Sequence, residues 1–137
     1  MIWNPDAETQ APAARATLQS ERLRATVAWA VERVPFHRER LGGVRVRGLE
    51  DLTTLPFTRK TDLREHYPFG LFAVPQGELA RIHASSGTKG KPTVVGYTAD
   101  DLAVWREAMA RVMVAAGARP GEMLHVAFGY GLFTGGL

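Results

Sequence analysis

The segment from Ser85 to Thr93 holds the residues whose types and spacing are best suited to chemistry. It reads Ser-Ser-Gly-Thr-Lys-Gly-Lys-Pro-Thr, so hydroxyls, glycines and lysines gather within nine residues. Glycine lets backbone amides approach an anion closely, hydroxyls donate hydrogen bonds, and lysine adds positive charge. This combination is suited to an anion-binding loop, for which a triphosphate is the natural ligand.

The same loop differs from the common nucleotide-binding P-loop. Gly87 and Gly90 are separated by two residues rather than four, and Pro92 follows Lys91 where serine or threonine is required. The residues after the loop predict a strand, so no helix N-terminus faces the anion. A plain surface turn would use the same residue types, and composition alone leaves that alternative open.

Two strands and a helix are expected to position this loop. The β-branched residues of 79–84 and 92–97 predict strands on either side of it. Thr98, followed three residues later by Asp101, predicts a capping box that starts a helix. Gly117 is expected to end that helix in the left-handed conformation. One face of the helix is apolar and contains Leu102, Trp105, Met109, Val112, Met113 and Ala116.

The N-terminal region predicts helix and loop. Apolar residues recur at helical spacing through 11–34, and Pro35 is expected to end that helix. Residues 35–56 read mostly as loop, and a short helix is predicted over 58–65, with Thr58 as its cap.

The C-terminal region predicts a turn over 119–122 and a buried strand over 123–128. The fold class is therefore α/β, a mixed sheet with flanking helices. We divide the chain into a helical and loop lead-in, 1–57, and an α/β part, 58–137, with the phosphate loop at 85–93. The last predicted strand needs further partners for its edges, so we expect an incomplete domain.

Charge and composition exclude several classes. Seventeen Lys and Arg stand against fourteen Asp and Glu, and no cysteine is present to form a disulfide, a thiolate zinc site or a nucleophile. No signal peptide or membrane-length apolar run is seen, so we expect a cytoplasmic protein without a membrane partner. A basic cluster lacks interleaved aromatics, which favours a solvated loop face over a nucleic-acid or other polyanion site. It consists of Arg38, Arg40, Arg45 and Arg47.

Several phrases carry a resemblance to known enzymes. The run Ser-Ser-Gly-Thr-Lys-Gly-Lys-Pro from Ser85 resembles the phosphate-binding signature of the acyl-adenylate-forming superfamily, except that Lys89 replaces a threonine. Within that superfamily the whole chain is similar to the opening part of the phenylacetate-CoA ligase family. The matching phrases are Trp-Asn-Pro at 3–5, Val-Pro-Phe at 34–36, Leu-Pro-Phe-Thr at 55–58, Tyr-Pro-Phe-Gly-Leu at 67–71 and Gly-Tyr-Gly-Leu-Phe-Thr-Gly-Gly at 129–136. His37 and Phe128 depart from the tyrosines that are usual in the family.

The resemblance implies the first part of the large N-terminal domain of an adenylate-forming ligase. Such an enzyme joins phenylacetate to ATP, releasing pyrophosphate, and then transfers the acyl group to CoA, releasing AMP. The implied phosphate-binding residues, which act with Mg²⁺, are Ser85, Ser86, Gly87, Thr88, Lys89, Gly90 and Lys91. The family's catalytic lysine and magnesium-binding residues correspond to positions beyond Leu137, so no catalytic or metal-binding residue is assigned in this chain. Alone it is expected to be inactive, with the rest of the ligase as its partner; a homodimer is left open.

A second candidate region surrounds Tyr130 and Phe133. Flat aromatic faces next to Gly135 suit an aryl acid, although core packing would use the same residues. Together with the resemblance, they predict a wall of the aryl pocket. His83 and His125 lie in predicted strands and are expected to be packed rather than catalytic. Two alternatives stay open, namely a non-catalytic module that binds a nucleotide or pairs with another subunit, and a ligase for another aryl acid such as benzoate.

Overall fold

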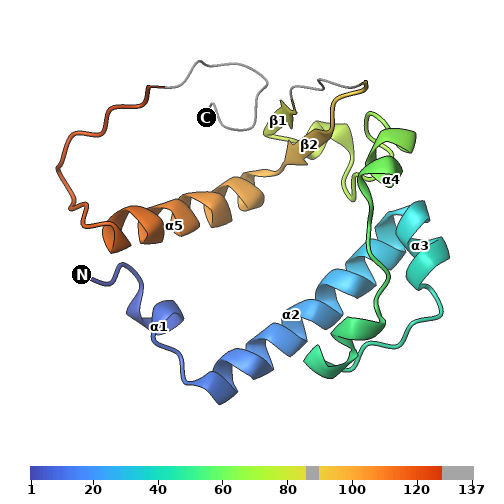
Figure 1. Cartoon of the computed structure of the whole chain (residues 1–137), viewed down its shortest axis with the longest axis horizontal. Helices are drawn as coiled ribbons and strands as arrows, with labels where there is room; N and C mark the ends of the chain where they lie inside the picture. The colour runs from blue at the N-terminus through green and yellow to red at the C-terminus, as the bar shows by residue number, and fades with distance from the viewer. Residues whose placement is uncertain (86–89, 128–137) are drawn as a thin grey trace.

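Helices dominate the part of the chain that the computed structural model describes, residues 1–85 and 90–127 (Figure 1). The α-helices are α1 (Pro5–Glu8), α2 (Pro12–Arg33), α3 (Pro35–Leu41), α4 (Lys60–Glu65) and α5 (Ala99–Ala115). The 3₁₀ helices are η1 (Leu49–Thr54) and η2 (Gln76–Glu78), and the strands are β1 (Arg81–Ala84) and β2 (Val94–Tyr97). Helices flanking a sheet agree with the predicted α/β class.

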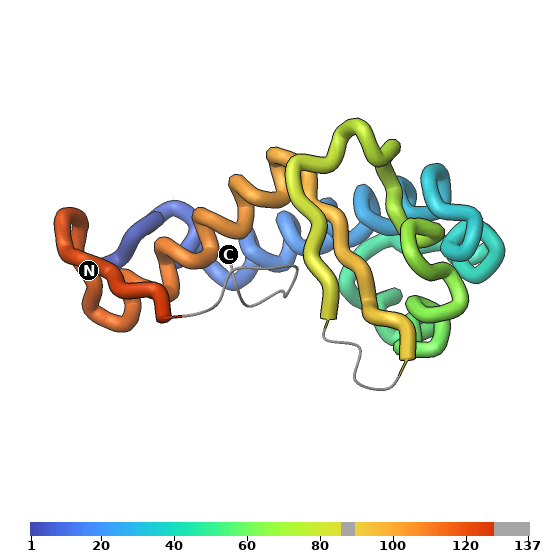
Figure 2. Tube along the Cα trace, turned by 90° about the horizontal axis from the view of Figure 1, so that it is seen from above, coloured from blue at the N-terminus to red at the C-terminus, as the bar shows by residue number. Residues whose placement is uncertain are grey.

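The strands β1 and β2 form an antiparallel hairpin, which confirms both predicted strands in shortened form. Figure 2 shows them side by side. The register pairs Ile82 with Gly96 and His83 with Val95. The packing leaves no room for a side chain at position 96. A Cβ on Gly96 would lie 2.8 Å from Cε2 of Phe72 and 2.9 Å from Cδ2 of Leu79. The hairpin therefore packs directly against the segment that precedes it.

The long helix predicted over 11–34 is confirmed as α2, but the prediction of loop after it is wrong. Pro35 ends α2 and also begins α3. Proline is well tolerated at the first helical position, where its missing amide hydrogen would have no partner anyway. The same residue is thus a stop for one helix and a start for the next, and η1 lies within the expected loop.

Helices α4 and α5 begin at capping residues, and the predicted cap of α4 is wrong by one position. Thr58 was the expected cap of α4, whereas the amide of Arg59 donates to Oδ2 of Asp62 at 2.7 Å and the helix begins after Arg59. The capping box of α5 is confirmed. The amide of Thr98 donates to Oδ2 of Asp101 at 2.8 Å, and the amide of Asp101 donates to Oγ1 of Thr98 at 3.1 Å. Gly117 closes the helix with φ +105°, as predicted.

The strand predicted over 123–128 is wrong for its described residues, 123–127. They have no regular structure and are exposed, with Met123 99% accessible and His125 also on the surface. A strand is held by hydrogen bonds to a neighbouring strand, and an apolar run without such a partner does not form one. The turn before it is confirmed by the bond from the amide of Glu122 to the carbonyl of Arg119 at 3.2 Å.

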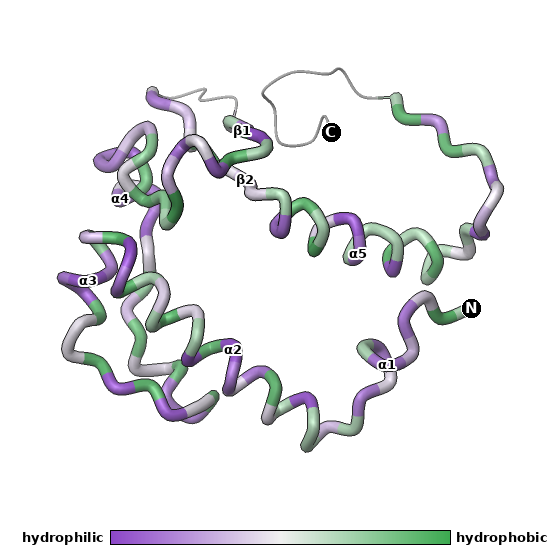
Figure 3. The backbone as a smooth tube through the Cα atoms, turned by 180° about the vertical axis from the view of Figure 1, so that it is seen from behind, coloured by the Kyte–Doolittle hydropathy of each residue, from purple (hydrophilic) through white to green (hydrophobic). Residues whose placement is uncertain are grey.

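Packing of the described elements is open. Helix α2 contacts α3 and η1, while α5 contacts β2. Few apolar side chains are buried among the described residues, where Val34 is 2% and Val114 8% exposed. Apolar positions run along much of α5 (Figure 3), and Val104 and Val112 are exposed there. None of the helices in the described ranges combines the length and apolar character needed to cross a membrane.

Candidate functional site

The base of the predicted phosphate loop is closed by Ser85 and Thr93. The amide of Ser85 donates to the carbonyl of Thr93 at 2.9 Å, and the amide of Thr93 donates to Oγ of Ser85 at 2.9 Å. This pair extends the β1–β2 ladder by one step. A hydroxyl that accepts one hydrogen bond keeps its own hydrogen for another acceptor. Ser85 can therefore close the loop and still donate to a ligand.

On the other side of the loop lie Gly90 and Lys91. Gly90 has φ +117°, a backbone conformation that residues other than glycine rarely adopt. A Cβ there would meet nothing within 4 Å, so the conformation rather than lack of space favours glycine. Lys91 is exposed, and its ammonium nitrogen lies 5.5 Å from the ring centroid of Tyr67. The hairpin thus brings Ser85, Gly90 and Lys91 to the same end of the sheet. The remaining predicted loop residues Ser86, Gly87, Thr88 and Lys89 lie outside the described residues, as do Tyr130, Phe133 and Gly135 of the predicted aryl pocket.

An aromatic cluster supports the strand that leads into the loop. His83 is 2% exposed, and its ring centroid lies 5.4 Å from that of Tyr97 and 5.7 Å from that of Trp105 on α5. The rings of Tyr97 and Trp105 are 5.1 Å apart. His83 is therefore packed, as predicted, and it joins β1 to α5. Its Nδ1 has no hydrogen-bond partner within the described part of the chain.

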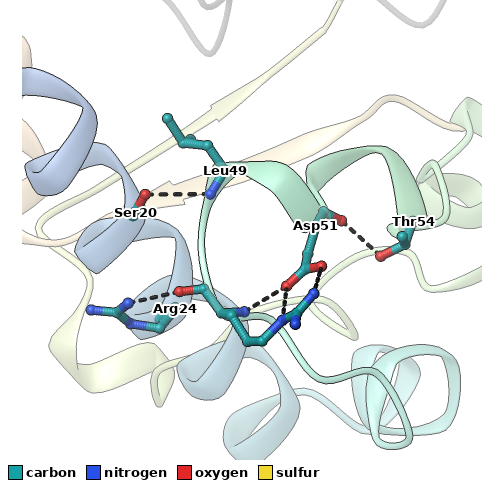
Figure 4. Close-up of polar contacts among 6 residues, drawn as sticks. Ser20, Arg24, Leu49, Asp51 and Thr54 are labelled. Carbon is teal, nitrogen blue, oxygen red and sulfur yellow. Dashed lines mark hydrogen bonds and ion pairs between the residues drawn. The ribbon is translucent and has the colours of Figure 1, made fainter. Parts of the chain in front are cut away.

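A second polar region lies between α2 and η1, where the ion pair of Arg47 with Asp51 forms what we call the clasp. Figure 4 shows Asp51 of the clasp together with Arg24 of α2. The amide of Arg47 donates to Oδ2 of Asp51 at 2.8 Å, Nε donates to the same oxygen at 3.1 Å, and Nη2 donates to Oδ1 at 3.0 Å. These bonds lower the pKa of Asp51 from its ordinary value of 3.8 to about 2. Arg24 on α2 donates to the carbonyl of Arg47 at 2.7 Å and ties the clasp to that helix.

Other arginines of the basic cluster are also used by the chain itself. Nε of Arg38 donates to the carbonyl of Val31 at 3.1 Å, and Nη1 of Arg40 pairs with Oδ2 of Asp62 at 2.9 Å. The pKa of Asp62 is lowered, first by the amide of Arg59 and then by Arg40. The prediction of a solvated face is confirmed, because Arg38, Arg40, Arg45 and Arg47 are all exposed. The expected loop is wrong for two of them, since Arg38 and Arg40 lie in α3. No group of three or more His, Cys, Asp or Glu side chains suited to a metal occurs within 1–85 and 90–127.

The sequence did not predict the contact between Tyr67 and Lys91. The two residues are far apart along the chain, and no periodicity relates them. The one signal that pointed to Tyr67 is its place in the Tyr-Pro-Phe-Gly-Leu phrase.

Comparison with known proteins identifies the class first. Residues covering 88% of the chain superpose on 28% of 2-hydroxyisobutyryl-CoA ligase, solved with 2-HIB-AMP and CoA in the thioesterification state, with 37% identity and a TM-score of 0.79. An open conformation of that ligase gives 34% identity and a TM-score of 0.76. The fold is that of an N-terminal part of an adenylate-forming CoA ligase.

Sequence relatives then define the family. A phenylacetate-coenzyme A ligase of Thermus thermophilus is 61% identical over the whole chain and 32% of the relative. The corresponding ligases of Aromatoleum evansii and Escherichia coli are 54% and 52% identical over 88% of the chain, which is 28% and 29% of each relative. No family model matches the chain. The chain belongs to the phenylacetate-coenzyme A ligase family and corresponds to its N-terminal portion. It spans about a third of the length of these relatives.

Proposed function

We propose that this chain is the N-terminal part of an AMP-forming ligase that converts phenylacetate, ATP and CoA to phenylacetyl-CoA, AMP and pyrophosphate. The observation that carries the proposal is the 61% identity over the whole chain to a phenylacetate-coenzyme A ligase. The related 2-hydroxyisobutyryl-CoA ligase was solved with an acyl-AMP and CoA, which supports a reaction through an acyl-adenylate.

The proposed reaction has two steps. The carboxylate of phenylacetate forms a bond to the α-phosphorus of ATP, and the bond from that phosphorus to the bridging oxygen of pyrophosphate breaks. The CoA sulfur, having lost its proton, then attacks the acyl carbon, and AMP leaves with the electron pair of the broken bond. Negative charge on the phosphates must be held in place during the first step, and donors fixed before the reaction do this best.

The hairpin loop is our candidate for that task. Its base is fixed by Ser85 and Thr93, its backbone bends at Gly90, and Lys91 supplies a positive charge at its end. We propose that the loop holds the β- and γ-phosphates by hydrogen bonds and charge without transferring a proton. Mg²⁺ is proposed to accompany ATP and would neutralise phosphate charge when it is bound.

Substitution of Lys91 in the complete ligase tests the loop assignment. A charge-assisted hydrogen bond contributes about 1.5–3 kcal/mol, so Lys91→Ala should raise KM for ATP by roughly tenfold to a hundredfold. KM for phenylacetate should stay close to the wild-type value. Unchanged kinetics with ATP would remove Lys91 from the site.

The aryl pocket is a separate part of the proposal. In the complete ligase, Tyr130→Ala and Phe133→Ala should weaken the use of phenylacetate and leave KM for ATP unchanged. Rates of CoA-thioester formation from phenylacetate and benzoate would identify the preferred acid. A faster reaction with benzoate would reassign the substrate while leaving the adenylating chemistry intact.

A further inference from the structure

We propose that Tyr67 is a positioning residue for Lys91 and holds its ammonium group beside the hairpin loop before ATP binds. The proposal rests on the proposed function, because it concerns the same loop. Tyr67 lies in the turn after α4, whereas Lys91 lies just before β2. The observation that carries it is the 5.5 Å separation between the Lys91 nitrogen and the centroid of the Tyr67 ring.

This separation falls within the range of a cation–π contact, about 6 Å. The ring face is electron-rich and attracts the ammonium without neutralising its charge. Ion pairs closer than 4 Å among residues 1–85 and 90–127 are formed by arginines rather than by Lys91. A carboxylate partner would compete with phosphate for the lysine, whereas an aromatic ring holds the side chain and leaves its charge available.

The position of Tyr67 is itself fixed by the preceding residue, His66. Nδ1 of His66 lies 2.8 Å from the carbonyl oxygen of Asp62, and its ring packs edge-on against Phe36 with centroids 4.9 Å apart. The amide of Gly70 donates to the carbonyl of His66 at 2.8 Å, and a Cβ on Gly70 would lie only 2.9 Å from that oxygen. The turn is therefore tight, and it is anchored to α3 and α4.

The far end of the same turn is anchored to the hairpin. The amide of Phe72 donates to the carbonyl of Phe69 at 3.0 Å, and the two rings lie 5.3 Å apart. The ring of Phe72 lies so close to Gly96 that a Cβ there would clash with it. Because the turn and β2 share this contact, packing places the backbone of the turn beside the strand that follows Lys91. A lysine that is ordered in advance loses less side-chain freedom when it binds an anion.

The first test compares variants of the complete ligase. Loss of an exposed cation–π contact corresponds to a roughly twofold to fivefold change in an equilibrium constant. Tyr67→Leu should therefore raise KM for ATP about twofold to fivefold, with kcat and KM for phenylacetate unchanged. Tyr67→Phe keeps the ring and should retain the wild-type KM.

A matched control removes a cation from a different aromatic ring. The guanidinium carbon of Arg33 lies 4.6 Å from the centroid of Trp29 on α2. Arg33→Met should leave KM for ATP unchanged. An equal rise in that variant would show that any lost cation–π contact has the effect, and it would overturn the proposal.

A double-variant cycle separates this proposal from the proposed function. Once Lys91→Met has raised KM for ATP, adding Tyr67→Leu should raise it no further. If Lys91→Met has no effect, the assignment of the loop to ATP fails. If Lys91→Met raises KM but Tyr67→Leu does not, only the role of Tyr67 is overturned.

A fluorinated ring keeps the test decisive even if Tyr67→Leu does not fold. Replacing Tyr67 by trifluorophenylalanine preserves the shape of phenylalanine but weakens the negative charge on the ring face. KM for ATP should then exceed that of Tyr67→Phe. Identical values for the two rings would contradict a cation–π role.

Discussion

The clasp and the hairpin loop are both polar turns with basic residues next to glycine, but they use their charge differently. In the clasp, Arg47 gives its backbone and side-chain donors to Asp51. In the hairpin, Ser85 and Thr93 bond to each other at the base, and Lys91 lies over the ring of Tyr67. A basic, glycine-rich turn therefore favours anion binding only where the chain does not use those donors itself.

Substitution of Asp51 should give the largest loss of stability. Asp51→Ala in the complete ligase leaves the donors of Arg47 without their acceptor and releases η1 from its position. We expect the Tm to fall by several degrees while KM for ATP stays near the wild-type value. Thermal unfolding and ATP kinetics measured on the same preparation check this. Glu50→Ala is the matched control, because Glu50 raises the pKa of Arg47 only by its charge, whereas Asp51 accepts hydrogen bonds from Arg47. For Asp51→Ala, an effect on KM equal to that of Lys91→Ala would remove the distinction between the two turns.

Gly90→Ala should mainly change KM for ATP, whereas Asp51→Ala should mainly lower the Tm. At φ +117° a side chain adds strain of about 1–3 kcal/mol, so the loop shifts or the protein loses that stability. We expect a higher KM for ATP, together with a modest fall in Tm. Gly77→Ala serves as the control, since a Cβ there would meet nothing within 4 Å. Equal kinetics for both variants would argue against a required bend at Gly90.

Thr98→Ala should have a smaller effect and should not touch the loop. The Thr98 hydroxyl accepts the amide of Asp101 at the start of α5, and loss of such a cap costs about 1 kcal/mol. Unfolding by denaturant should show this loss, and Thr98→Ser, which keeps the hydroxyl, should recover most of it. A change in KM for ATP larger than the change in stability would indicate that the capping box also shapes the hairpin.

The smallest effect on stability is expected from a change of pH, because Asp51 becomes protonated only in acid. Its folded-state pKa of about 2 lies below the ordinary 3.8, so the clasp stabilises the fold fully above about pH 4. That contribution is lost as pH falls from 3.8 towards 2. The difference in Tm between wild type and Asp51→Asn should therefore stay constant from neutral pH to about pH 4 and shrink below it. A difference that already shrinks near neutral pH would contradict this pKa shift.

Local patterns predicted much of this fold. The strands beside the loop, the capping box at Thr98 and the left-handed Gly117 all depend on residues close in sequence, and each is confirmed. Pro35 was interpreted only as a helix stop, because its other role, as first residue of α3, depends on residues 36–41 rather than on the periodicity of α2. The expected strand over 123–128 depends on a partner strand, which a local pattern does not specify.

The candidate site was predictable to a smaller extent. Residue types left open an anion loop or a plain turn, and the resemblance to a ligase family favoured a phosphate loop, which stays a prediction. The packing of His83 was predicted, but its partner Trp105 was not. That contact and the contact of Tyr67 with Lys91 join distant parts of the chain, so no local spacing predicts them. The clasp was not predicted for another reason. Arg47 and Asp51 are four residues apart, a spacing that pairs side chains within a helix, but the helix η1 begins only at Leu49.

A crystal structure of the complete ligase with a non-hydrolysable ATP analogue and Mg²⁺ would test the central claim most directly. We predict that the ammonium nitrogen of Lys91 lies within hydrogen-bond distance of a β- or γ-phosphate oxygen, with Tyr67 beside it. Phosphates bound elsewhere, with the turn between β1 and β2 facing solvent, would contradict the account.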